Sequence, residues 1–267
     1  MLKALIVNDD GYKAAGIRAL VRELNPHYHT VAVAPDREQS WMGKSISGHH
    51  ELALTPISYH EFEGFHVNGT PADCTQLGLY ETGKRPDFVV SGINHGANIG
   101  HAHIISSGTV GAAFEAALQG VPAFAVSVWQ VKRLNPDMDF NAPASIELFK
   151  TAATVTRRVI DKVMAAGFPK SVQVIVINVA YDVTPDAKWA VTTPHTLSYG
   201  KLFDLQSNGM YKNLGSNELE VDKAPDTDLA ALAKGYVSVV PLTLRLTSDA
   251  GRAELAEVLD APIFSTM

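Results

Sequence analysis

The chain has 267 residues, of which 46% are apolar and 19% charged, and it carries a formal net charge of -6. This composition is typical of a globular protein with an apolar core, and the length allows one large α/β domain or two small ones. The acidic balance argues against a protein that binds nucleic-acid polymers, which would need a basic face. A small phosphorylated ligand in a local site remains compatible with it.

The sequence shows no targeting or membrane signal. No apolar run approaches the length of a membrane span, and the N-terminal MLKALIVNDD meets charged residues too early for a signal peptide. Cys74 is the only cysteine, so an intramolecular disulfide cannot form, which is typical of a reducing compartment. We therefore expect a soluble, cytoplasmic protein that spans no membrane.

Short apolar runs alternate with helical patterns through residue 179. The alternation predicts a mostly parallel sheet with helices on both faces. In chain order, the expected elements are a strand at 2–7, a helix at 16–24, strands at 30–34 and 87–93, a helix at 109–119, a strand at 122–128, a helix at 144–166 and a strand at 172–179.

Two stretches break this alternation. Residues 45–66 have mixed polar alternation and predict a β-rich hairpin arm, whereas residues 181–226 are poor in helical pattern and rich in Gly, Asn, Thr and Pro. The second stretch is too long for a plain loop inside a compact domain, so we expect an extended arm that contacts another subunit. Regular structure returns in a C-terminal extension, with a helix at 227–234, a strand at 236–240 and a last helix at 250–259.

Oxygen-bearing side chains follow three of the predicted strands. Asp9 and Asp10 come directly after the first strand, Ser40 follows the second, and Asn94 and Asn98 follow the strand at 87–93. In a parallel sheet these strand ends share one edge, where ligands bind. Adjacent buried carboxylates are costly unless a cation neutralises them, and hard oxygen ligands suit Mg²⁺, Mn²⁺ or Ca²⁺. The alternative is that the two aspartates form a turn or cap the next helix.

A group of small and hydroxyl-bearing residues precedes the helix at 109–119. Backbone N–H groups at a helix start, together with Ser107 and Thr109 hydroxyls, form a typical anion site. An ordinary N-cap by serine or threonine explains the same pattern. No lysine follows in the spacing of a nucleoside-triphosphate P-loop, so that site is not supported.

Three further side-chain types have two interpretations each. His101 and His103, close in sequence to His95, could bind a transition metal, but the spacing favours residues of a surface loop or substrate pocket. Trp41 could stack on a nucleobase or could pack in an interface. Cys74 is expected to pack as a small apolar residue.

With these segments in place, the sequence resembles the SurE family of nucleoside monophosphate phosphatases. The motifs that carry the resemblance span most of the chain and occur in family order; only about 130–220 matches loosely. They are NDDG (8–11), APDREQS (34–40), VNGTPADC (67–74), SGINHGAN (91–98), SGTVGAAFEA (107–116) and TDLAALAKGYVSVVPL (227–242).

The resemblance implies a single domain over 1–267 with a Rossmann-like fold and one divalent metal ion per subunit, Mg²⁺ or Mn²⁺. It implies hydrolysis of nucleoside 5′- and 3′-monophosphates, and of short polyphosphate. It also implies a homodimer or homotetramer built partly through exchanged arms, a role that would fall to 181–226. The implied metal ligands are Asp9, Asp10, Ser40 and Asn94. The implied phosphate-binding residues are Asn98, Ser107, Gly108 and Thr109.

Two departures from the family pattern concern the surroundings of this implied site. The segment between Asn98 and Ser107 is one residue longer, and Ser106 stands where a tyrosine is usual. Trp41 stands where a small residue is common. Both changes bear on loop geometry and substrate preference more than on the metal ligands.

The expected chemistry assigns a task to each group. A bound metal would act as a Lewis acid and lower the pKa of a water molecule. Asn98 and the groups at Ser107–Thr109 would stabilise charge on the phosphoryl oxygens. Asp10, rather than Asp9, is our candidate to orient or deprotonate the attacking water, and direct attack by a carboxylate stays open.

Three other classes of protein share parts of the pattern. A receiver-like signalling domain also places acids after its first strand, but it needs a phospho-accepting aspartate where this chain has Asn94. A haloacid-dehalogenase-type phosphatase needs Asp-x-Asp, whereas Asp9 and Asp10 are adjacent. A non-catalytic protein that binds nucleotide and metal would carry the same residues and release no phosphate.

Overall fold

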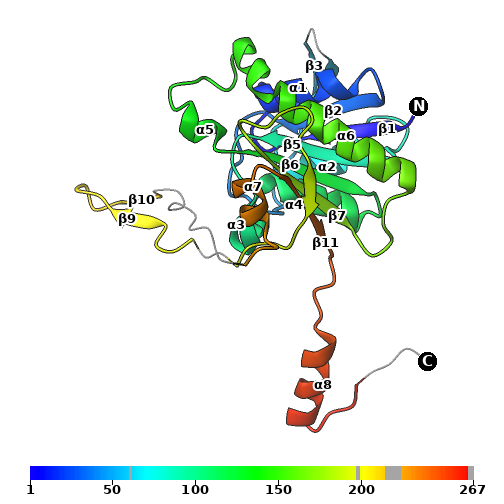
Figure 1. Cartoon of the computed structure of the whole chain (residues 1–267), viewed down its shortest axis with the longest axis vertical. Coiled ribbons are helices and arrows are strands. Elements are labelled where there is room, and N and C mark those ends of the chain that lie inside the picture. The colour runs from blue at the N-terminus through cyan, green and yellow to red at the C-terminus, as the bar shows by residue number, and fades with distance from the viewer. Residues whose placement is uncertain (60–61, 197–198, 214–223, 264–267) are drawn as a thin grey trace.

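The computed structural model describes residues 1–59, 62–196, 199–213 and 224–263. Within them, nine strands form one sheet in the order β3-β4-β2-β1-β5-β6-β7-β11-β8, and helices lie on both of its sides (Figure 1). This arrangement confirms the expected α/β fold.

The centre of the sheet is parallel and its edges are mixed. The parallel strands are β4 (Glu63–Val67), β2 (His29–Pro35), β1 (Lys3–Val7), β5 (Phe88–Asn94), β6 (Ala123–Trp129) and β7 (Val174–Ala180). β3 (Leu54–Ser58) pairs antiparallel with β4, which makes the predicted hairpin an edge of the main sheet. At the other edge, β11 (Val237–Leu242) runs antiparallel to β7 and parallel to β8 (Trp189–Val191).

Two apolar layers hold the helices on the sheet. Helices α1 (Ala15–Leu24) and α6 (Lys150–Ala166) cover one face, where Ile17 and Ile160 are fully buried. Helices α2 (Pro71–Tyr80) and α4 (Gly108–Leu118) cover the other face, where Cys74 and Val110 are fully buried. Because both faces are covered, every residue of β1, β5 and β7 is buried, which explains their continuous apolar runs.

Some helices differ from the expectation. The helix expected at 144–166 is a 3₁₀ segment, η1 (Pro143–Phe149), followed by α6. Helices α2, α3 (Gly100–Ser106) and α5 (Val131–Leu134) were not predicted. The start of α2 rests on a capping box, in which Thr70 accepts a hydrogen bond from the Asp73 N–H and the Asp73 carboxylate accepts one from the Thr70 N–H. This exchange satisfies helix-end donors that an apolar pattern does not reveal.

The stretch at 181–226 divides into parts with different surroundings. β8 belongs to the main sheet, whereas β9 (Phe203–Leu205) and β10 (Tyr211–Asn213) form a separate antiparallel hairpin. Figure 1 shows this hairpin standing off the body of the molecule. Residues 214–223 of the expected arm lie outside the described residues.

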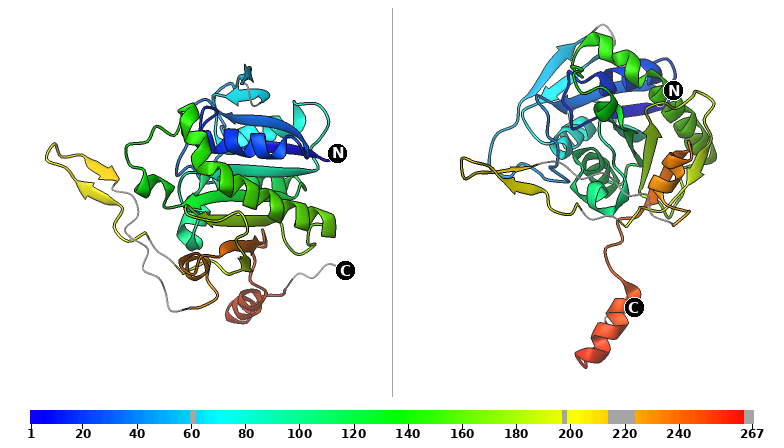
Figure 2. Two further views of the ribbon diagram at one scale, coloured as in Figure 1. Left: turned by 45° about the horizontal axis from the view of Figure 1, so that its top comes forward. Right: turned by 60° about the vertical axis from the view of Figure 1, so that its left-hand side comes forward.

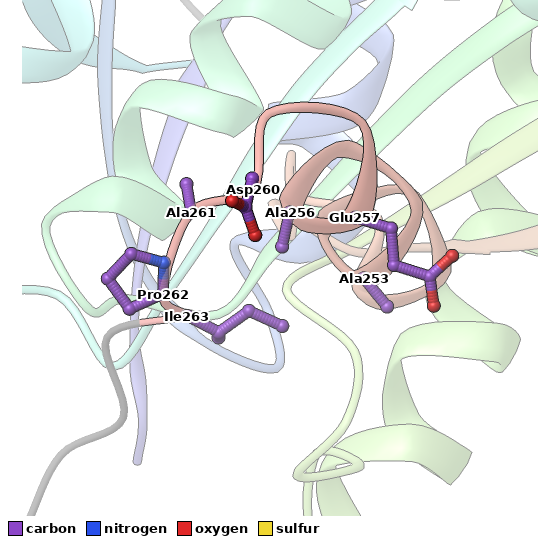
Figure 3. Close-up of a pocket in the computed structure, with 7 residues that line it drawn as sticks. All are labelled: Ala253, Ala256, Glu257, Asp260, Ala261, Pro262 and Ile263. Atoms are coloured by element: carbon purple, nitrogen blue, oxygen red, sulfur yellow. The ribbon is translucent and has the colours of Figure 1, made fainter.

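The C-terminal extension also leaves the body. After α7 (Asp228–Ala233) and β11, the chain runs to α8 (Asp249–Val258), which has no buried residue and stands apart from the sheet (Figures 1 and 2). None of the helices in the described part of the chain combines the length and apolarity needed to cross a membrane. Figure 3 shows a shallow concavity where the chain folds back on α8, lined by Ala253, Ala256, Glu257, Asp260, Ala261, Pro262 and Ile263.

Candidate active site

The predicted site residues gather at the carboxyl ends of adjacent parallel strands. β1 lies between β2 and β5, so the segments after these three strands leave the same edge of the sheet. Asp9 and Asp10 follow β1, and Asn94 is the last residue of β5. All three are buried. This is the edge at which open α/β sheets bind ligands.

Asp9 joins three segments of the chain. Its Oδ1 accepts a hydrogen bond of 2.5 Å from the Thr109 hydroxyl at the start of α4, and its backbone oxygen accepts one of 2.7 Å from the Gln39 N–H. A Cβ placed on Gly108 would lie 2.7 Å from the Asp9 Cβ. The absence of a side chain at Gly108 therefore lets α4 approach the carboxylate closely.

Asp10 is paired with His95, which the sequence analysis assigned to a loop or pocket. The His95 N–H donates to Asp10 Oδ2 at 3.3 Å, and His95 Nε2 lies 3.2 Å from Asp10 Oδ1. The second contact is a close approach without a hydrogen bond. Asp10 Oδ1 is buried and has no hydrogen-bond partner among the described residues. One carboxylate oxygen of Asp10 is thus left for a ligand.

Burial sets the protonation of this group. It raises the pKa of both Asp9 and Asp10 to about 7, helped at Asp9 by the charge of Asp10 and at Asp10 by the charge of Glu38. Burial, together with the positive charge of Lys132, lowers the pKa of His95. Both carboxyl groups therefore gain or lose a proton near neutral pH, and a cation bound at this position would compete with those protons.

Asn98 is held by side chains from β6 and β7, the two strands that follow β5 in the sheet order. Its backbone N–H lies 3.2 Å from both Ser127 Oγ of β6 and Asn178 Oδ1 of β7, and the Asn178 amide donates to the Asn98 carbonyl at 3.1 Å. The Ser127 hydroxyl donates to Asn178 Oδ1 at 2.5 Å. The Asn98 side-chain Nδ2 is buried without a hydrogen-bond partner in the described residues. This clamp fixes the backbone of Asn98 and leaves its amide available for an anion.

The clamp predicts that Ser127→Ala lowers catalytic turnover. Ser127→Ala loses two buried hydrogen bonds, from Asn98 and to Asn178, at about 1 kcal/mol of stability each, and the looser Asn98 should lower kcat about threefold to tenfold. Ser145→Ala is the control, because that fully buried hydroxyl donates to the Asp139 carbonyl at 2.7 Å and takes no part in the clamp on Asn98. Thermal melts should show a loss of stability in both variants, larger in Ser127→Ala, with a kinetic loss in Ser127→Ala alone. An equal kcat in the two would contradict the role of the clamp.

The start of α4 provides backbone donors. Ser107 is the N-cap, and its hydroxyl accepts from the Val110 N–H at 3.1 Å, as the capping interpretation expected. The Thr109 hydroxyl is engaged by Asp9. The N–H groups of Gly108 and Thr109, at the positive end of an 11-residue helix, are the donors that remain for an anion.

Two of the predicted ligands are less closely engaged. Asn94 donates its Nδ2 to the Gly96 carbonyl at 2.6 Å, which leaves its Oδ1 as the acceptor for a ligand. Ser40 is half-buried, and its hydroxyl donates to Glu38 Oε1 at 2.6 Å. Ser40 is placed near the strand ends by its neighbour Gln39, whose N–H binds the Asp9 backbone. In this structure the Ser40 hydroxyl is therefore engaged by Glu38 rather than by either aspartate.

These residues fit a hard divalent cation. The supporting observation is a buried oxygen of Asp10 without a hydrogen bond, next in sequence to the buried carboxylate of Asp9 and at the same sheet edge as the buried Asn94. Among the described residues, no three His, Cys, Asp or Glu side chains gather in a metal-binding group. Two carboxylates with neutral oxygen donors are the kind of ligand set that hard divalent cations such as Mg²⁺ or Mn²⁺ take in proteins.

Other polar groups near the site have structural partners. His101 Nδ1 lies 3.1 Å from the His195 carbonyl, and His103 Nδ1 lies 3.1 Å from the Ile99 carbonyl. The buried Asp228 of α7 accepts from the N–H groups of Gly100 and His195, and so ties the start of α3 to the arm. Neither this tie nor the roles of Ser127 and Asn178 were predicted from the sequence. The sequence did carry one signal for these residues. Ser127 and Asn178 are polar residues inside otherwise apolar strands, and Asp228 is a charged residue at the start of an apolar helix.

Comparison with known proteins points to one family. The sequence model described as "Survival protein SurE" matches residues 4–201. The chain is 34% identical to "5'-nucleotidase SurE" of Methanothrix thermoacetophila, over 97% of this chain and 99% of that protein. It is 36% identical to the protein of the same name from Citrifermentans bemidjiense, over 93% and 96%.

A solved structure gives the same result. The crystal structure of the SurE protein from Aquifex aeolicus superposes with a TM-score of 0.76 at 31% identity, covering 97% of this chain and 100% of that one. The conserved length and the shared fold agree with the motifs at the strand ends. This chain therefore belongs to the SurE family.

Proposed function

We propose that this chain is a divalent-metal-dependent phosphatase that hydrolyses nucleoside 5′-monophosphates to nucleoside and phosphate. The observation that carries the proposal is the buried Asp9–Asp10 pair at the end of β1, where Asp9 accepts a hydrogen bond from Thr109 at the start of α4. Burial raises the pKa of both carboxyl groups to about 7, so the ionised pair is unfavourable unless a cation neutralises it. The relatives named 5'-nucleotidase support the choice of substrate. Nucleoside 3′-monophosphates and short polyphosphate are further proposed substrates.

The ligands proposed for the cation are Asp9, Asp10, Ser40 and Asn94. When bound, a divalent cation supplies Lewis-acid activation of a phosphate oxygen and of a water molecule. Asp9 is held in place by Thr109, so its carboxylate is oriented before substrate arrives. Asp10 keeps one oxygen without a hydrogen bond, and we assign it the task of orienting the attacking water or accepting its proton.

The phosphate group is proposed to rest on α4 and Asn98. The N–H groups of Gly108 and Thr109 point along the helix axis at its positive end, where phosphoryl oxygens bind favourably. The Asn98 Nδ2 provides a further buried donor. Because these donors are fixed by the fold, they stabilise developing charge on the phosphoryl oxygens without reorganising. The backbone clamp on Asn98 keeps that donor in position.

A phosphate-release panel tests the proposal. The purified chain is incubated with nucleoside 5′- and 3′-monophosphates and with tripolyphosphate, in Mg²⁺, Mn²⁺ or EDTA. We expect release from 5′-monophosphates with at least one metal, and a loss of about 10³-fold or more in EDTA. Binding of nucleotide with no release under any condition would favour a non-catalytic nucleotide-binding protein instead.

A second copy of this chain is the proposed partner of the two projecting segments. Phe203 and Tyr211 on the hairpin are exposed by 52% and 69%, and Leu255 and Val258 on α8 by 57% and 80%. Apolar side chains gathered on arms that leave the body need a covering surface. We expect the full chain to sediment as a dimer or tetramer, and a chain ending at Leu242 to form a smaller species. Sedimentation of the full chain as a monomer would contradict this expectation.

The cellular location proposed for the chain is the cytoplasm. Cys74 is fully buried in α2, and burial raises the pKa of its thiol, so it packs as an apolar residue as expected. A chain with one buried cysteine forms no internal disulfide, which is typical of proteins in a reducing compartment. Fractionation of cells that express the tagged chain would test this placement.

A further inference from the structure

Trp41 has an unusual backbone conformation for its size. Its φ is +66°, in the left-handed region that bulky residues rarely adopt, and its side chain is 42% exposed. Conformations of this kind persist where the surrounding structure enforces them, often at functional sites. Neither burial of the ring nor a regular element accounts for the placement of this side chain.

Two other aromatic rings contact the ring of Trp41. Tyr199, from the segment after β8, packs edge-on against Trp41 with ring centroids 5.3 Å apart. His103 of α3 lies 6.1 Å from Trp41 and 5.2 Å from Tyr199, at 90° to the latter. Contacts of this kind orient an aromatic ring, and Trp41 stays 42% exposed despite them. The three residues form an aromatic platform drawn from three separate segments.

The platform adjoins the proposed phosphate site. The Tyr199 hydroxyl donates to the Ser106 hydroxyl and contacts the Ala102 carbonyl. The Ser106 carbonyl accepts from the Gly43 N–H at 2.9 Å, which ties the loop that carries Trp41 to the end of α3. Ser106 is next in sequence to the Ser107 cap of α4, and Trp41 is next to Ser40. The exposed ring is therefore held beside the anion-binding helix start.

We infer that Trp41, supported by Tyr199 and His103, is the surface on which the base of a nucleoside monophosphate stacks. This inference rests on the proposed function, because it needs the phosphate at the start of α4. Every nucleobase has a π face, so a stacking platform accepts all of them and favours the larger purines. The platform thus selects nucleotides over phosphomonoesters that have no base.

The test compares a nucleotide with a substrate that lacks the base. The kcat/KM values for AMP and ribose 5-phosphate are measured with Mn²⁺ for the wild type, Trp41→Gly and Trp41→Phe. We expect the AMP to ribose 5-phosphate ratio to fall about tenfold in Trp41→Gly and less than threefold in Trp41→Phe. Glycine suits the left-handed backbone, so the first variant is not strained at this position.

Trp189→Ala is the matched control, since that ring is half-buried on the edge strand β8, where it contacts Arg158. Its ratio should equal that of the wild type. An unchanged ratio in Trp41→Gly would overturn the inference. Equilibrium binding of AMP and of ribose 5-phosphate is measured in parallel with Mn²⁺. If the wild type releases no phosphate, the proposed function fails, and the binding ratio still decides whether Trp41 recognises the base.

Discussion

Asp10→Asn is expected to lower kcat/KM for nucleoside monophosphates by at least about 10³-fold and, without divalent cation, to stabilise the fold. The loss of activity follows because the amide keeps the shape of the side chain but loses a negative ligand. The gain in stability follows because burial, with the added charge of Glu38, makes the ionised Asp10 carboxylate unfavourable. The same change would therefore move activity and stability in opposite directions.

The sign of the stability effect depends on pH. Burial raises the folded-state pKa of Asp10 from the ordinary 3.8 to about 7. Between these values the unfolded chain has released the proton and the folded chain retains it, so the stability contributed by this group is present in full below about pH 4 and is lost as the pH rises to 7. We expect the metal-free wild type to lose on the order of 2–4 kcal/mol across that window, and Asp10→Asn to lose less.

Asp73→Asn is the matched control for a buried carboxylate. Asp73 is also buried, but it accepts hydrogen bonds from the N–H groups of Thr70 and Ser47 at 2.8 and 3.0 Å. Its replacement should lower the melting temperature, whereas Asp10→Asn in EDTA at pH 8 should raise it. Thermal melts from pH 4 to 8 and phosphate release measure both properties. Wild-type activity in Asp10→Asn would remove Asp10 from the site.

Gly108→Ala is expected to lower activity about 100-fold and to destabilise the fold. The new Cβ would lie 2.7 Å from the Asp9 Cβ, 2.9 Å from Asp9 Oδ2 and 3.1 Å from the Gln39 carbonyl. The Asp9 Cβ and the Gln39 carbonyl are fixed to the backbone, and the Asp9 carboxylate is held by its hydrogen bond from Thr109, so relieving the clash requires α4 to shift away from β1. Such a shift misaligns the N–H donors of the helix with the carboxylates, and displacements of about 1 Å cost roughly that much in rate.

Helix propensity alone would predict the opposite result for Gly108→Ala, since alanine favours a helix by about 1 kcal/mol over glycine. Gly48→Ala is the control for a glycine substitution without a clash, because Gly48 lies outside the helices and a Cβ there meets no atom within 4 Å. We expect Gly48→Ala to match the wild type in melting temperature and kcat/KM. A Gly108→Ala variant as active as Gly48→Ala would show that the close approach of α4 is not required.

The fold was predictable to the extent that local patterns encode it. The buried strands β1, β5 and β7 read as continuous apolar runs because both faces of the sheet are covered, and their bounds lie within two residues of the expectation. Helix α2 was missed because a capping box, rather than an apolar stripe, marks its start. The stretch at 181–226 was expected as one arm, but β8 pairs with β11, which lies far along the sequence.

The candidate site divides in the same way. By itself, the sequence determined which segments end at the ligand-binding edge, because a run of parallel strands places all its carboxyl ends together; it therefore identified Asp9, Asp10 and Asn94 as neighbours. Only the tertiary structure decided that His95 contacts Asp10, that Ser127 and Asn178 clamp Asn98, and that Tyr199 supports Trp41. These contacts join residues separated by tens to more than a hundred positions. The order of the strands in the sheet and the packing of the 181–226 segment create these contacts. Neither can be inferred from the spacing of residues along the sequence.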